Sequence, residues 1–123
     1  MTLTVIELQV LSSISDDDYF LYEVEWELNT HYPERRGETN RLAAIETLRR
    51  LYERGLVEAS WFTERLALIR PLSATEFAEQ LKDAENWVPG CSGPRCIQVT
   101  TTDAGFQECT RAFRARPPES PGH

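Results

Sequence analysis

The strongest structural signal in this chain is the stretch ETNRLAAIETLRRLYERGLVEASWF, from Glu38 to Phe62. Its apolar residues recur at spacings of three and four, which is typical of one face of an α-helix. The predicted inward face consists of Leu42, Ile45, Leu48, Leu51 and Tyr52. The sequence therefore predicts a helix over 39–54.

Both ends of this helix carry local signals. Thr39 or Asn40 can cap the N-terminus through a side-chain oxygen. Gly55 stands where helices commonly end on a left-handed residue, and Leu56 can supply the apolar contact that accompanies such a stop. The apolar and aromatic residues that follow predict a strand over 56–62.

Length and composition indicate an ordinary globular protein. The chain has 123 residues, of which 41% are hydrophobic and 27% charged. We expect one domain over 1–116 and a disordered tail over 117–123, which contains three prolines. No apolar run approaches a membrane span, and no basic region precedes an apolar core at the N-terminus. We therefore expect a cytoplasmic protein that does not contact a membrane.

The net charge of −7 is unevenly distributed along the chain. Residues 1–33 contain seven Asp and Glu residues and no Lys or Arg. Residues 34–70 contain eight arginines and six glutamates, so this segment, which includes the helix over 39–54, is net positive. The acidic charge therefore precedes the helix.

Two further helices are predicted ahead of it. Thr4 and Glu7 form a capping box at the start of a helix over 5–14, although β-branched residues leave a strand as the alternative. Asp16–Asp18 are expected to form a turn that caps the next helix, over 19–29, and places negative charge at its N-terminus.

The second half of the chain predicts a strand over 66–70, a helix over 74–85, a strand over 96–101 and a helix over 103–114. Ser73 and Glu76 form a second capping box, and Thr102 is expected to cap the last helix. The expected inward residues are Phe77, Leu81, Ala84, Phe106, Cys109 or Thr110, and Phe113.

Two stretches resemble a known fold. AIETLRRLYERGLVEASWF resembles the third helix and first wing strand of winged helix-turn-helix proteins of the MarR and PadR type. VTTTDAGFQECTRAF resembles their second wing strand and following helix, where a Thr-x-x-Gly pattern, here Thr102 to Gly105, often follows the wing. The resemblance implies an α+β fold, mostly α, with about five helices, a small antiparallel sheet and an insertion over 66–96 in the wing region.

The resemblance also implies a transcriptional regulator that binds double-stranded DNA, as a homodimer through its first and last helices. The helix over 39–54 is then the recognition helix, in which Asn can pair with adenine and Arg with guanine. The expected outward residues are Thr39, Asn40, Ala43, Ala44, Thr47 and Arg50. The expected phosphate contacts include Arg35, Arg36, Arg41 and Arg65. An ordinary solvated helix is the alternative, and the glutamates that alternate with these arginines argue against DNA.

The acidic first segment suggests a different class of function. Its carboxylates and aromatic rings can form a surface for a basic protein partner, as in a protein of immunity or antitoxin type. The residues of this surface are Asp16, Asp17, Asp18, Tyr19, Tyr22, Glu23, Trp26 and Glu27. The simpler alternative is that the carboxylates only cap a helix and the rings lie in the core.

The sequence offers little support for a cofactor, a metal or catalysis. Three cysteines make a disulfide framework improbable, so reduced thiols are expected, with a Cys91–Cys96 disulfide as the alternative. Only Cys109, His31 and His123 could complete a zinc site with that pair. The chain has no Gly-rich phosphate loop and no histidine beside a Ser or Cys nucleophile, so we expect a protein that is not an enzyme.

Overall fold

The structure is a computed structural model that describes residues 3–62, 69–88 and 96–115. Its elements, in chain order, are α1 (Val5–Asp16), β1 (Tyr19–Phe20), α2 (Leu21–His31), the 3-10 turn η1 (Pro33–Arg35), α3 (Glu38–Glu53), β2 (Val57–Phe62), β3 (Ile69–Pro71), α4 (Ala74–Leu81), the 3-10 turn η2 (Ala84–Trp87), β4 (Cys96–Thr101) and α5 (Asp103–Ala115). The expectation of an α+β, mostly helical fold with a small antiparallel sheet is confirmed.

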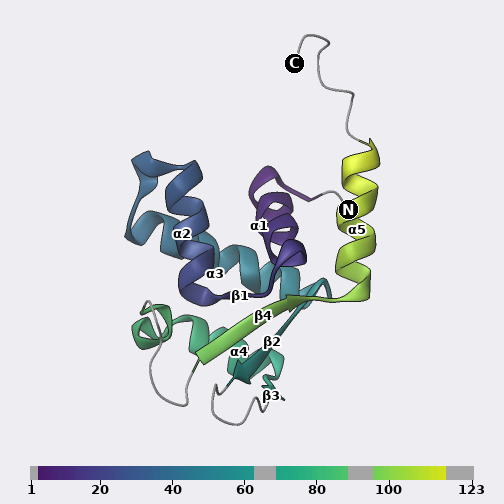
Figure 1. Cartoon of the computed structure of the whole chain (residues 1–123). Coiled ribbons are helices and arrows are strands. Elements are labelled where there is room, and N and C mark those ends of the chain that lie inside the picture. The colour runs from purple at the N-terminus through teal and green to yellow at the C-terminus, as the bar shows by residue number, and fades with distance from the viewer. Residues whose placement is uncertain (1–2, 63–68, 89–95, 116–123) are drawn as a thin grey trace.

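The strands form an antiparallel sheet in the order β1-β4-β2-β3. At its centre β2 pairs with β4, with Ala59 opposite Val99. On its other edge β2 pairs with β3, so β2 lies between β4 and β3. Figure 1 shows α1, α2 and α3 on one side of the sheet and α5 beside α1.

The first helix begins as predicted. The Thr4 hydroxyl accepts a hydrogen bond from the Glu7 backbone N–H at 3.1 Å, and the Glu7 carboxylate accepts one from the Thr4 N–H at 2.8 Å. This capping box satisfies two N–H groups that the helix itself leaves free. The strand alternative for this segment is therefore wrong.

The turn between α1 and α2 differs from the prediction. Tyr19 and Phe20 are not helical, because they pair with Val99 and Gln98 of β4. Asp16–Asp18 do not cap α2. Asp16 is the last residue of α1, and at the start of α2 it is the Glu23 carboxylate that accepts a hydrogen bond from the Phe20 backbone N–H.

The sequence predicts the C-terminal end of α3 correctly but not its N-terminal end. Gly37, with φ of 93°, precedes the helix and provides no side-chain cap, so the expected caps Thr39 and Asn40 are wrong. The C-terminal stop is confirmed. Gly55 has φ of 73°, and the N–H of Leu56 donates to the Leu51 carbonyl at 2.9 Å, which is the Schellman pattern.

The segment between β2 and β4 packs into the same core as the rest of the domain. The Ser73 capping box is present, and Leu72 and Phe77 are buried. Helix α4 ends at Leu81, earlier than predicted, and Ala84 is exposed rather than inward. Trp87 covers the end of α4, where its indole N–H donates to the Leu81 carbonyl at 2.9 Å.

The Thr-x-x-Gly pattern fixes α5 to the turn between α3 and β2. The Thr102 hydroxyl accepts from the Gly105 N–H at 3.0 Å and donates to the Gly55 carbonyl at 2.7 Å. Gly105 is buried and packs directly against the backbone of Leu56. A Cβ at position 105 would lie 2.1 Å from the Leu56 carbonyl oxygen. Cys109 is inward as expected, whereas Phe106 is 48% exposed, so its inward prediction is wrong.

Candidate interaction surfaces

The outward face of α3 matches the prediction only in part, because Thr39 and Arg50 are exposed as expected. Asn40 and Thr47 are 1% and 6% exposed, and Ala44 is fully buried, so none of the three can contact a base. Leu42, expected in the core, is instead 57% exposed. The helix is rotated relative to the prediction because α1 and α2 pack on its other side.

Asn40 has a structural role in the interior. Its side-chain amide donates to the Asn29 side-chain oxygen at 2.9 Å and to the Tyr32 carbonyl at 3.0 Å. These two bonds hold the end of α2 against the start of α3. A buried amide with both donors satisfied contributes to stability and is not free to bind a ligand.

The arginines of the outward face of α3 are paired with glutamates. Arg49 donates to Glu46 and to Glu53, each at 2.6 Å, and Arg50 donates to Glu46 at 2.9 Å. The hydrogen bond from Arg49 lowers the pKa of Glu46. These pairs largely neutralise the positive charge on this half of the helix.

Two of the other expected DNA contacts already have partners within the chain. Arg41 pairs with Glu25 at 2.9 Å, and the Arg35 guanidinium lies over the Tyr32 ring, 5.4 Å from its centroid. Arg36 and Thr39 are exposed, and Ala43 is half-buried. Arg65 lies outside the described residues.

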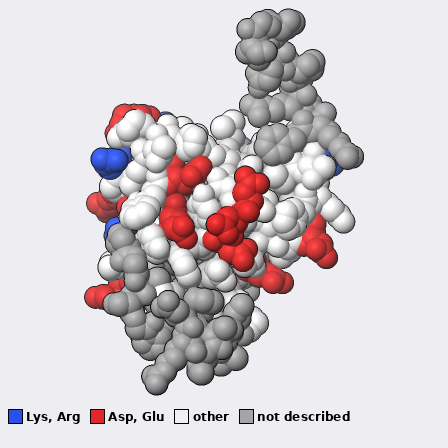
Figure 2. Space-filling model, viewed as in Figure 1, with Lys and Arg blue, Asp and Glu red and all other residues white. Residues whose placement is uncertain are grey.

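Carboxylates gather on the face formed by the end of α1, β1 and α2, as Figure 2 shows. We call this the acidic face and define it by Asp16, Asp17, Asp18, Glu23 and Glu27. Asp16–Asp18 are exposed, and their carboxylates form no ion pair with the part of the chain that the structure describes. Glu27 accepts from the Ser13 hydroxyl at 3.0 Å and lies 3.2 Å from the His31 ring nitrogen Nε2. The unpaired negative charge therefore lies at Asp16–Asp18.

Three aromatic rings lie beside the acidic face. Phe20 stacks on Tyr22, with centroids 6.1 Å apart, and Tyr22 meets Trp26 edge-on at 5.1 Å. The alternative that these rings lie in the core is wrong for Trp26, which is 54% exposed. Tyr19 is half-buried, and burial, followed by the charge of Glu27, raises its pKa.

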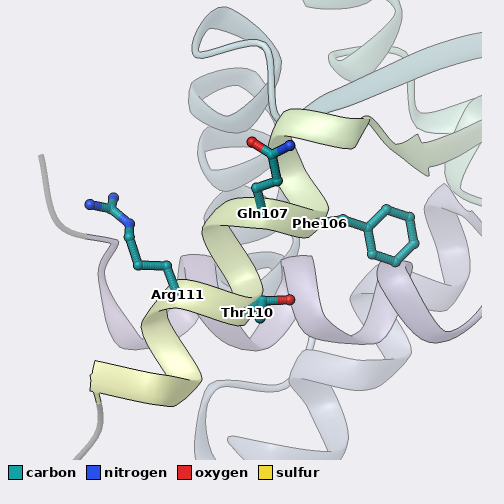
Figure 3. A pocket seen from close by; sticks show the side chains of 4 residues that line it. All are labelled: Phe106, Gln107, Thr110 and Arg111. Carbon is teal, nitrogen blue, oxygen red and sulfur yellow. The ribbon is translucent and has the colours of Figure 1, made fainter.

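Two hollows lie elsewhere on the described surface. One, of about 370 Å³, lies between α3 and α4 and has Tyr52 and Phe77 in its lining. The other, of about 360 Å³, is lined by residues of α5, and Figure 3 shows Phe106 and Arg111 pointing away from each other there. Since the side chains of the second hollow diverge, they do not form a convergent polar site.

The cysteines differ from the expectation of reduced thiols. Cys96 is disulfide-bonded, as in the oxidised alternative, whereas Cys91 lies outside the described residues. Cys109 is a free, buried thiol whose pKa is raised by burial. The described residues contain no group of three or more His, Cys, Asp or Glu placed to hold a metal.

Burial predicts how Cys109 reacts. A raised pKa leaves little thiolate at neutral pH, and thiolate is the reactive form. We therefore expect iodoacetamide at pH 7.5 to label Cys109 at least about tenfold more slowly in the native protein than in urea. Mass spectrometry of the peptide that contains Cys109 measures this ratio. Equal rates in both conditions would contradict the buried position.

Comparisons with protein-family models, with curated proteins and with solved structures give no match. Among the helices of the described ranges, none combines the length and the apolar character needed to cross a bilayer. Function is therefore inferred from the surfaces of the chain itself.

Proposed function

We propose that this chain is a winged-helix module that binds a basic protein partner through its acidic face. The observation that carries the proposal is the exposed, unpaired carboxylate run Asp16–Asp18 beside a half-exposed tryptophan, Trp26. Aromatic anchors with complementary charge around them are what protein interfaces use. The mode of action is that of an immunity or antitoxin-type protein, which neutralises a basic partner by covering its surface.

The strand order supports the winged-helix part of the proposal. The described chain runs from α1 through β1, α2 and α3 to β2, and β4 comes later in the sequence. In the sheet, β4 lies between β1 and β2. This is the arrangement expected when a short strand after the first helix joins the two wing strands. The elements β3, α4 and η2 then form the insertion between those two strands.

The same topology favours a second candidate, DNA binding through α3, but the charges on that helix count against it. Affinity for DNA comes largely from cations that replace the counterions of phosphates. Arg49 and Arg50 would have to give up carboxylate partners on their own helix before they could meet a phosphate. With a net charge of −7, the whole chain is also repelled by DNA.

A DNA titration separates the two candidates. Fluorescence anisotropy with labelled genomic fragments at 50 mM and 200 mM salt is expected to show no salt-sensitive binding. Binding that weakens steeply with salt and is abolished by Arg50→Glu would favour DNA instead. Asn40 and Thr47 are not suitable for this test, because they are buried.

Charge reversal tests the acidic face directly. Asp17→Lys combined with Asp18→Lys is expected to weaken binding of the partner at least about tenfold, because like charges then face each other across the interface. The matched control is Glu79→Lys combined with Glu85→Lys, which changes the net charge equally at exposed positions of α4 and η2.

The measurement is affinity capture from the source cells with quantitative mass spectrometry, followed by titration of the captured protein. The expected partner is basic, is retained by the control variant, and is lost from the Asp17 and Asp18 variant. If every captured protein is retained equally by both variants, the acidic face is not the binding surface.

A further inference from the structure

Tyr22 and Trp26 form an open corner of two aromatic rings on the outer side of α2. They are four positions apart in the sequence, so they share one face of the helix. Their ring planes meet at 77° with centroids 5.1 Å apart, and the Phe20 ring stacks on Tyr22 at an interplanar angle of 10°. The corner is therefore preformed, because each ring is held by the next.

The corner lies on a rigid support and is open to solvent. The opposite side of α2 carries Leu21, Val24 and Leu28, all of which are buried in the core. Trp26 is more than half exposed although it is the largest side chain of the helix. A fixed, exposed indole ring of this kind binds a partner group with little loss of side-chain entropy.

The charge around the corner selects a cation. Glu23 follows Tyr22 directly in sequence and belongs to the acidic face, whereas Glu27 is already engaged by Ser13 of α1 and by His31. Glu23 uses one carboxylate oxygen, Oε1, to cap the Phe20 N–H at 2.9 Å, and its Oε2 has no hydrogen-bond partner in the described residues. Aromatic faces also carry partial negative charge, which attracts cations, and tryptophan attracts them most strongly.

We infer that the corner between Tyr22 and Trp26 receives an arginine side chain of the basic partner. A planar guanidinium can stack on the Trp26 ring while its N–H groups reach a neighbouring carboxylate such as Glu23. A lysine ammonium is a compact charge that cannot stack in this way. This inference rests on the proposed function, since it names the group that the acidic face binds.

The probe is a capped heptapeptide with three arginines separated by glycines, compared with the same peptide containing lysine or citrulline. Titrations followed by two-dimensional NMR are expected to shift the Trp26 indole N–H signal, assigned with Trp26→Phe. The arginine peptide is expected to bind about threefold more tightly than the lysine peptide. The neutral citrulline peptide is expected to bind at least about tenfold more weakly than the arginine peptide.

Trp26→Ala is expected to weaken binding of the arginine peptide about fivefold and to remove its preference over lysine. The matched control is Phe106→Ala, which removes a similarly exposed aromatic ring from α5 and is expected to leave binding unchanged. Since both rings are on the surface, circular dichroism should show folded protein for both variants.

The outcomes separate this inference from the proposed function. The first contradicting outcome has three parts: both basic peptides bind equally, Trp26→Ala has no effect, and Asp17→Lys with Asp18→Lys abolishes binding. In that case the arginine corner is wrong, but the acidic face is still the binding surface. If neither the Trp26 variant nor the Asp variant changes binding, both proposals are wrong.

Discussion

Gly105→Ala is expected to lower the free energy of unfolding by about 3 kcal/mol, the upper part of the usual range for overpacking a core. The added methyl group would lie 2.1 Å from the Leu56 carbonyl oxygen and 2.6 Å from Thr101 Cγ2. The carbonyl cannot move aside easily, because it also accepts the Thr102 N–H at 3.1 Å. Helix α5 must therefore shift away from the turn that it closes.

Urea denaturation followed by circular dichroism measures this loss. The control is Gly55→Ala, where nothing lies within 4 Å of the added Cβ and only the left-handed backbone, with φ of 73°, opposes the side chain. That strain costs about 1–2 kcal/mol. If Gly105→Ala is no more destabilising than Gly55→Ala, the close approach of α5 to Leu56 is not as described.

Asn40→Asp is expected to cost about 3 kcal/mol of stability at pH 7 although it changes the side-chain volume very little. The amide donates to two oxygen atoms, Asn29 Oδ1 and the Tyr32 carbonyl, and a carboxylate in its place would repel both. Because the side chain at position 40 is only 1% exposed, water cannot compensate for this repulsion.

The cost of Asn40→Asp should depend on pH. Burial raises the pKa of the introduced carboxyl in the folded state above its value in the unfolded chain. The loss of stability is therefore smallest below the unfolded pKa of about 3.9 and grows as pH rises through the folded pKa. Thermal unfolding from pH 4 to pH 7, with Thr39→Ala as an exposed neighbouring control, measures this change. A constant difference across this range would contradict the buried position of the amide.

Three of the helix ends could be predicted from sequence because their signals are local. The capping boxes at Thr4 and Ser73 and the glycine stop at Gly55 each depend on a few neighbouring residues, and all three are present. Strand β1 could not be predicted in this way. Its two residues, Tyr19 and Phe20, become a strand only by pairing with β4, which lies far along the chain.

The buried face of α3 matches the prediction at Leu48 and Leu51 but also includes polar residues, which polarity alone would place at the surface. Asn40, Ala44, Thr47 and Leu51 are spaced by four, three and four residues, which is itself a helical stripe. Asn40 can be buried because Asn29 and the Tyr32 carbonyl, on another segment, accept its two side-chain hydrogen bonds. A residue type alone cannot reveal such a partner.

The candidate site was predicted in part. The sequence identified the carboxylates of Asp16–Asp18 and the aromatic residues of α2, although it assigned Asp16–Asp18 a capping role as well. It could not show that Tyr22 and Trp26 meet at 77°, since ring orientation depends on packing against Phe20. The spacing of Glu46 and Arg50 indicates their pairing within α3, whereas the pairing of Arg41 with Glu25 of α2 depends on how the two helices pack.

The sheet ends on both sides in very short strands. The outer strands are β1, with two residues, and β3, with three, and β3 includes Pro71, which has no backbone N–H. Within the described ranges, neither outer strand offers the long run of free backbone groups that a protein binding by strand addition needs. The same shortness protects copies of this chain from joining edge to edge into larger aggregates. Within the described part of the sheet, side chains therefore offer a partner more than the edges of β1 and β3 do, and single surface substitutions should change recognition.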